Sequence, residues 1–140
     1  METGYNNKIK KNFVENELVE VWIENGIIIE IFKPNVIHVD IASAKKIVEL
    51  RLSVSKGVMM PMFVDSVNVK KMDSESRKYL SEGDGVKYVS ACAFHVHDYV
   101  AWVVGKIFLT FFSPTSAIKT QIFRSRAKAI EWLQHYKNLN

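Results

Sequence analysis

The sequence predicts an α/β fold, with a β-hairpin followed by alternating helices and strands in the order ββαβαβαβα. An Asn-Gly pair separates two apolar runs near the start, which is the strongest short signal for a hairpin. Downstream, short apolar runs alternate with segments whose apolar residues recur every three or four positions, which is a helical period. Alternation of this kind implies right-handed crossovers, so we expect a mixed, mostly parallel five-stranded sheet covered by helices.

Length and composition agree with one globular domain. The chain has 140 residues, of which 48% are hydrophobic and 24% are charged, and these proportions disfavour disordered, collagenous and coiled-coil classes. We expect a single domain over residues 15–140. Residues 1–14 are expected to form a flexible arm, because their lysines and asparagines leave little to bury.

The hairpin is expected over residues 17–24 and 27–33, which are rich in β-branched, aromatic and aliphatic side chains. Asn25 and Gly26 lie between the two runs, and both tolerate the positive φ angles that a tight turn needs. Pro34 ends the second strand, because proline has no N–H group to donate to a ladder.

A helix is expected over residues 41–55, with Asp40 at its N-cap and apolar residues at three- and four-residue spacing. Residues 58–64 form a short apolar run that is consistent with a buried strand. Pro61 lies inside this run, which predicts a strand that begins late, near Met62, or that lies at a sheet edge.

Asp73 predicts the start of the next helix, which is expected to end near Gly83. Residues 88–96 read as a strand buried on both faces. Asp98 is then expected to cap a very apolar helix over residues 99–112.

A Ser-Pro pair follows that helix and ends it. Residues 118–123 alternate between two faces, as a partly exposed strand would. Residues 124–136 are expected to form the last helix. No internal repeat or low-complexity tract is present in the sequence.

The formal charge is +4, and the excess lies in the last segment, which carries Lys119, Arg124, Arg126, Lys128 and Lys137 against Glu131. This is the pattern of a solvated helix face. Proteins that read nucleic acid combine a denser basic stripe with aromatic or groove-entering motifs, and the sequence has none, so we expect no nucleic-acid partner.

Location and disulfide chemistry are also constrained. The longest apolar stretch, near residues 100–112, contains Lys106 and is shorter than the roughly 20 residues that span a bilayer. No run resembles a signal peptide, so we expect a cytoplasmic protein. Cys92 is the single cysteine and cannot form an internal disulfide; its apolar neighbours indicate a buried structural thiol rather than a nucleophile.

Several segments carry a family resemblance: Val21–Ile28, Ala44–Glu49, Met62–Asp65, Ser76–Leu80 and Ala129–Leu133. Together with the order of elements, they resemble small bacterial domains of unknown function near the SpoIIAA-like, STAS/SEC14-type fold, over about residues 17–137. The resemblance implies a non-enzymatic domain that binds a partner kinase or anti-sigma factor. It also implies control by phosphorylation of a serine at the start of one helix.

The family pattern at that helix is Asp-Ser-Ser-Gly. Here Asp73 and Ser74 match its first two positions, Glu75 stands at the usual phosphoacceptor position, and Ser76 stands where the family has glycine. We therefore treat Ser74 and Ser76 as candidate regulatory phosphosites. In the alternative interpretation, Asp73 and Ser74 only cap the helix and Glu75 only complements its dipole.

Two histidines suggest a metal site. His95 and His97 lie two apart on an expected strand, so their side chains point to one face. With Asp98 they could bind zinc or iron, since imidazole and carboxylate suit both. A further ligand would have to come from His38 or Asp65. In the alternative interpretation, His97 and Asp98 are a strand end and a helix cap, and the chain has no cofactor.

The helix over 99–112 is apolar nearly all round, with Tyr99, Trp102, Leu109 and Phe112 beyond its main apolar stripe. Such a helix needs cover on both sides. A second subunit, a bound apolar small molecule, or neighbouring helices and the N-terminal arm could supply it. We therefore expect a non-enzymatic regulatory or protein-interaction module, a homodimer or bound to a protein partner. The alternative is a carrier of small apolar, lipid-like molecules.

Overall fold

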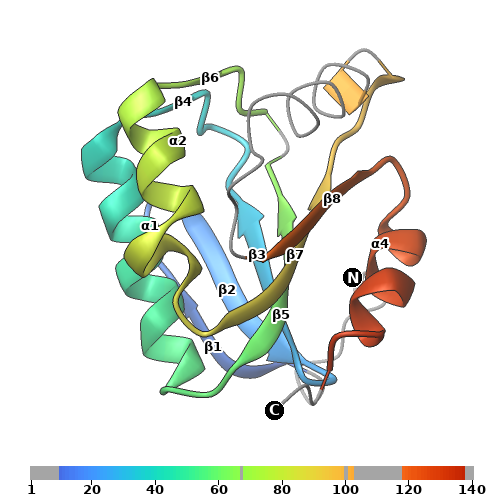
Figure 1. Ribbon diagram of the computed structural model, residues 1–140. Coiled ribbons are helices and arrows are strands. Elements are labelled where there is room, and N and C mark those ends of the chain that lie inside the picture. Colours follow the sequence, from blue (N-terminus) through green and yellow to red (C-terminus); the bar gives the residue numbers. More distant parts are fainter. Residues whose placement is uncertain (1–9, 67, 100, 103–117, 138–140) are drawn as a thin grey trace, which may run out of the picture.

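The computed structural model describes residues 10–66, 68–99, 101–102 and 118–137 (Figure 1). Its main sheet has six strands in the order β1-β2-β3-β5-β7-β8. They are β1 (Lys11–Glu15), β2 (Val19–Glu24), β3 (Ile27–Phe32), β5 (Met60–Asp65), β7 (Val89–His95) and β8 (Lys119–Phe123). A separate two-stranded ribbon joins β4 (His38–Val39) to β6 (Lys71–Met72). The helices are α1 (Ile41–Ser55), α2 (Ser74–Ser81), the short 3-10 helix η1 (Gly83–Val86) and α4 (Arg126–Gln134).

The sheet is mixed and mostly parallel, as the sequence predicted. β1, β2 and β3 form antiparallel pairs, whereas β3, β5, β7 and β8 pair in parallel. In the hairpin turn both Asn25 (φ 51°) and Gly26 (φ 77°) have positive φ, which is the geometry of a type I′ turn.

The sixth strand, β1, corrects the expected count of five and the expected arm over residues 1–14. Residues 11–14 of that segment belong to β1, which pairs with β2. Asn12 has a positive φ of 58°, and the register shifts between Lys11 and Val14. Val14 packs against the core, and the Phe13 ring lies 5.9 Å from that of Trp22. These contacts with β2 hold a segment whose own composition is polar.

Pro61 does not delay β5 or place it at an edge. β5 begins at Met60, is buried throughout, and lies between β3 and β7. The register with β7 shifts between Met60 and Met62, so Pro61 lies at an irregularity where a missing N–H is tolerated.

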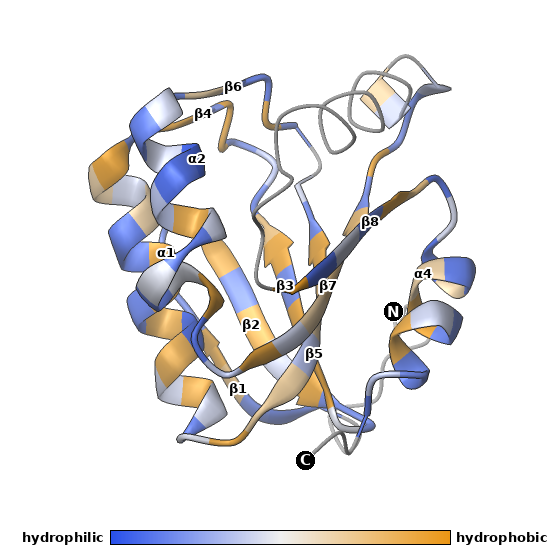
Figure 2. Ribbon diagram, viewed as in Figure 1, coloured by the Kyte–Doolittle hydropathy of each residue, from blue (hydrophilic) through white to orange (hydrophobic). Residues whose placement is uncertain are grey.

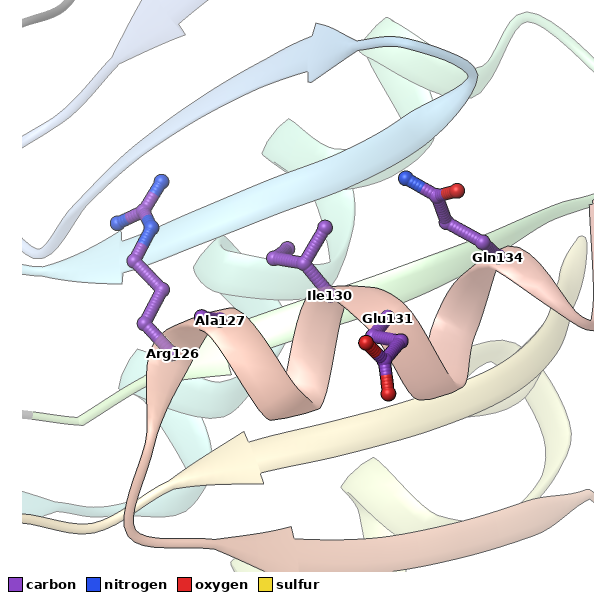
Figure 3. Close-up of a pocket in the computed structure, with 5 residues that line it drawn as sticks. All are labelled: Arg126, Ala127, Ile130, Glu131 and Gln134. Carbon is purple, nitrogen blue, oxygen red and sulfur yellow. The ribbon is translucent and has the colours of Figure 1, made fainter.

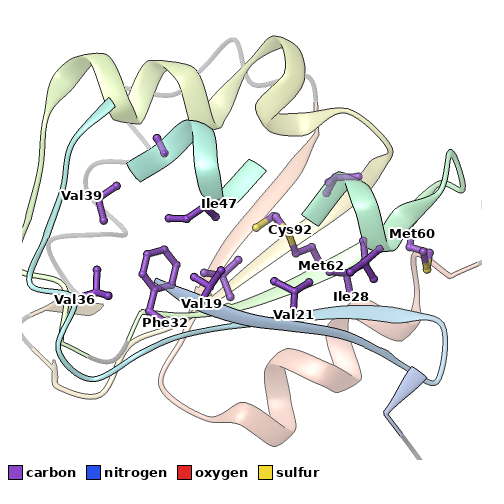
Figure 4. Close-up of a cluster of buried hydrophobic side chains, with 14 residues drawn as sticks. Val19, Val21, Ile28, Phe32, Val36, Val39, Ile47, Met60, Met62 and Cys92 are labelled. Atoms are coloured by element: carbon purple, nitrogen blue, oxygen red, sulfur yellow. The ribbon is translucent and has the colours of Figure 1, made fainter. Parts of the chain in front are cut away.

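Helices cover both faces of the sheet (Figures 1 and 2). α1 and α2 cover one face, over a cluster of buried side chains that includes Val21, Ile28 and Ile47 (Figure 4). α4 covers the other, where Ala129 and Leu133 pack with Phe63. Among the described residues, no helix has the length and apolarity of a membrane span.

Arg51 ties α1 to η1 through the protein interior. Its side chain is 1% exposed and donates to the backbone oxygens of Asp84 (3.0 Å), Gly85 (3.2 Å) and Lys87 (2.9 Å). A planar guanidinium can satisfy several carbonyls at once, so η1 is held on the α1 side of the sheet.

Candidate functional site

The carboxyl ends of the parallel strands bring three of the candidate residues together. Asp65 is the last residue of β5 and His95 is the last residue of β7, and the two are register partners. His97 follows two residues later. Beyond this edge lie the β4–β6 ribbon and the start of α2 (Figure 1). This edge is where open α/β sheets bind ligands.

Both histidines contact the same carboxylate. His95 Nδ1 lies 3.2 Å from Asp65 Oδ2, and His97 Nε2 lies 2.9 Å from Asp65 Oδ1. The ring centroids of His95 and His97 are 4.4 Å apart. The side chains of Asp65 and His95 are 11% and 12% exposed, whereas that of His97 is 51% exposed. One potential ligand atom from each residue lies within 4.8 Å of the others.

The third member of the cluster is Asp65, and Asp98 has a different role. The Asp98 carboxylate accepts a hydrogen bond from the backbone N–H of Ala101 at 2.7 Å, and Trp102 N–H donates to the Asp98 carbonyl. Asp98 is therefore a helix cap, as one interpretation of the sequence held. His38 is also elsewhere, with its Nε2 atom 2.8 Å from Asp73 Oδ1.

The start of α2 separates the two candidate phosphosites. Ser74 is exposed, and its hydroxyl oxygen accepts from Arg77 Nη2 at 3.2 Å. Arg77 also donates to the Met72 carbonyl at 2.8 Å. Ser76 is 0% exposed, and no described residue hydrogen-bonds its hydroxyl. Of these two serines, Ser74 is therefore the one that a kinase could reach in the folded chain.

Asp73 occupies the N-cap position of α2, but its side chain makes no capping hydrogen bond. Its carboxylate instead pairs with His38 of β4. His38 belongs to β4, and Asp73 directly follows β6. The backbone N–H of Asp73 also donates to the Val39 carbonyl of β4 at 3.3 Å. Tertiary pairing has replaced the local cap that the sequence predicted.

Of Trp102, Leu109 and Phe112, the three residues expected at an interface or a ligand, the structure describes Trp102. Trp102 is half-buried and its indole N–H donates to the Ile122 carbonyl at 3.3 Å. Its ring lies 5.8 Å from that of Tyr99, which is 58% exposed. Leu109 and Phe112 lie outside the described residues.

The sequence did not predict one buried acid. Glu30 is 5% exposed, and burial raises its pKa to about 7, with Arg51 partly opposing the rise. The sequence did contain a sign of this burial: Glu30 lies on the same face of its strand as Ile28 and Phe32, which face the core. Burial also raises the pKa of the Cys92 thiol, which agrees with a structural cysteine.

A hollow lies beside α4 (Figure 3). It is lined by Arg126, Ala127, Ile130, Glu131 and Gln134. Three of these five side chains are polar or charged, so the described lining does not resemble a pocket for a lipid chain.

Comparisons with known proteins agree with this fold and assign no activity. The model of a family described as "Domain of unknown function (DUF7793)" matches residues 21–137. No curated protein matches the chain. A similar solved structure is that of an uncharacterized protein from the DUF3478 family with a SpoIIAA-like fold, from Shewanella loihica PV-4. The two share 12% sequence identity and a TM-score of 0.58, over 86% of this chain and 98% of that one. The expected SpoIIAA-like fold is thereby confirmed.

Proposed function

This chain belongs to the DUF7793 family of domains of unknown function, and from this premise we propose that it is a non-enzymatic protein-interaction module of SpoIIAA-like type. The partner docks on a surface formed by Ile37, His38, Asp73, Ser74 and Arg77, which we call the α2 entry surface. Phosphorylation of Ser74 controls this docking. SpoIIAA-like domains, which this sequence resembles, act by binding partners, and that resemblance supports the choice.

The observation that carries the proposal is the setting of Ser74. It is the first residue of α2, it is exposed, and the Arg77 guanidinium lies 3.2 Å from its hydroxyl. A phosphate here would meet the positive end of the helix dipole and a guanidinium. It would also add nearly two negative charges beside Asp73 and Glu75, and so change the charge that a partner meets.

The surroundings of Ser74 are suited to a small interface. Ile37 is 47% exposed, and its carbonyl accepts hydrogen bonds from the N–H groups of Lys70 and Lys71 in the neighbouring strand. An exposed apolar residue is therefore held beside the His38–Asp73 pair, whose side chains are 44% and 40% exposed. An apolar centre with a polar rim is the usual anatomy of a protein interface.

Ser74→Glu tests the proposal, with Ser81→Glu as matched control at the other end of the same helix. A partner captured from the native cell is purified, and its Kd is measured for each chain by calorimetry. We expect Ser74→Glu to weaken binding roughly 10-fold or more, as loss of an interface contact does, and Ser81→Glu to leave it unchanged. Equal affinity for wild type and Ser74→Glu would refute control at Ser74.

Self-association would use a different surface and is tested separately. The sequence expectation places Trp102, Leu109 and Phe112 in a homodimer contact, and the exposed Tyr99 ring adjoins Trp102. Light scattering after size exclusion gives the mass at micromolar concentration. A dimer that Tyr99→Asp converts to monomer supports self-association, whereas a monomeric wild type refutes it.

The alternative function, a carrier of apolar molecules, depends on the segment 99–112, of which residues 99, 101 and 102 are described. Native mass spectrometry of the freshly purified chain separates the two functions. A co-purified lipid-sized mass would favour the carrier, and a bare chain mass favours the interaction module.

A further inference from the structure

We propose that Asp65, His95 and His97 form a binding site for one divalent transition-metal ion of the Zn²⁺ class. The site is independent of the α2 entry surface, with which it shares no residue. We call these three residues the Asp-His-His cluster.

The ligand atoms already converge. Asp65 Oδ2 and His95 Nδ1 are 3.2 Å apart, Asp65 Oδ1 and His97 Nε2 are 2.9 Å apart, and one atom from each residue lies within 4.8 Å of the others. Atoms bound to one tetrahedral ion at about 2.1 Å lie about 3.4 Å from each other. Small side-chain rotations therefore suffice to place all three atoms around one ion.

The type of ligand selects the ion. Two imidazoles and one carboxylate suit zinc, iron, cobalt and nickel, whereas Ca²⁺ and Mg²⁺ prefer oxygen atoms alone. Three protein ligands leave a coordination position open, as in zinc sites that keep a bound water. His97 is half exposed and is the most solvent-accessible residue of the cluster.

The backbone holds the ligands in place. Asp65 and His95 are register partners at the ends of two interior strands. Just beyond β7, the N–H of Val96 donates to the Phe123 carbonyl of β8 at 2.9 Å. This hydrogen bond fixes the residue between the two histidines, so both rings are presented from the same edge of the sheet. Ligands on strand ends are more precisely placed than ligands on free loops.

Charge and burial favour a cation. The Asp65 carboxylate is 89% removed from solvent, and His95 is nearly as buried. A carboxylate in such a place needs a positive partner. A contrasting pair elsewhere, His38 and Asp73, has one histidine only and is 44% and 40% exposed. That pair has the features of an ordinary surface contact, and it provides a matched control.

The test uses the full-length, tag-free chain, stripped with a chelator and titrated with Zn²⁺ by calorimetry, and with Co²⁺ followed by its visible absorption. We expect one ion per chain. His97→Ala and Asp65→Asn should each weaken Zn²⁺ binding roughly 100-fold or more, since removal of a direct ligand exceeds the loss caused by an outer-shell change. His38→Ala should leave both affinity and stoichiometry unchanged.

Folding is checked by circular dichroism for every variant. His97 is half exposed, so His97→Ala keeps the test valid even if Asp65→Asn does not fold. The proposal is overturned if wild type binds no Zn²⁺ at one equivalent, if His97→Ala binds as tightly as wild type, or if His38→Ala removes binding. None of these outcomes bears on Ser74, so the two proposals fail separately.

Discussion

The buried Glu30 is expected to make the stability of this protein depend on pH, and Glu30→Gln should remove this contribution. Glu30 lies on β3, opposite Val21 of β2 and Val64 of β5, and is 5% exposed. Burial raises its pKa from 4.5 to about 7, and the charge of Arg51 only partly opposes the rise. The folded state therefore favours the protonated acid, whereas the unfolded state ionises near the ordinary pKa.

The sign and the size of the pH dependence follow from this difference in pKa between the folded and unfolded states. Because the pKa of Glu30 is higher in the folded chain, the free energy of unfolding falls as pH rises from about 4.5 to about 7, then levels off. A difference of one pKa unit between the folded and unfolded states corresponds to about 1.4 kcal/mol of stability. A pKa about 2.5 above the ordinary value therefore changes the free energy of unfolding by ~3 kcal/mol. Glutamine resembles the protonated acid and has no charge to bury.

The assay is urea unfolding followed by circular dichroism at several pH values between 4 and 8. The difference between Glu30→Gln and wild type should grow by ~3 kcal/mol across this range, in favour of the variant. Glu49→Gln, which removes an exposed carboxylate on α1, should follow wild type at every pH. A Glu30→Gln difference that stays constant with pH would refute the assignment of a buried, protonated Glu30.

Three further substitutions and one labelling experiment give additional predictions. Arg51→Met leaves the carbonyls that Arg51 serves without a donor, so it should lower the free energy of unfolding by about 3 kcal/mol, and a loss below about 1 kcal/mol would contradict this. Gly85→Ala places a Cβ against the backbone of Tyr79 and Leu80, and should destabilise by about 2 kcal/mol or more. Gly57→Ala meets no atom within 4 Å but has a φ of 79°, so it should lose only about 1 kcal/mol in the same urea assay. Cys92 is buried and its thiol pKa is raised, so it should react with a thiol reagent roughly 100-fold more slowly than an exposed cysteine, until urea unfolds the chain.

Local signals predicted the order of elements well. The Asn25-Gly26 turn, the Asp40 cap and the helical period after it each act within a few residues. Asp40 Oδ1 accepts from Ser43 N–H at 2.8 Å, and α1 covers the expected range. Such signals can be read in sequence because the interacting atoms are close along the chain.

Non-local contacts caused the errors. β1 has mostly exposed side chains, so no hydrophobic period marks it, and its pairing with β2 holds it in place. Pro61 was expected to delay its strand or to place it at an edge, because proline removes a ladder hydrogen bond. Instead, an irregularity in the register with β7 accommodates the proline inside the sheet. In both cases the deciding partner lies in another strand.

The candidate sites show the same division. The sequence placed His95 and His97 on one face and named Asp65 among the residues that could join them, but spacing along the chain could not choose Asp65 over Asp98 or His38. Parallel register made that choice, because it sets the ends of β5 and β7 side by side. Likewise, sequence alone marked Ser74 and Ser76 equally, and only the packing of α2 buried one and exposed the other.

The sequence by itself therefore determined the α/β class, the hairpin and the main helices and strands, since these follow from periodicity, caps and turns. Tertiary structure alone decided which carboxylate meets the two histidines, which serine reaches solvent, and that Glu30 enters the core. Each of these outcomes depends on atoms brought together from distant parts of the chain, and neither composition nor local spacing encodes that proximity.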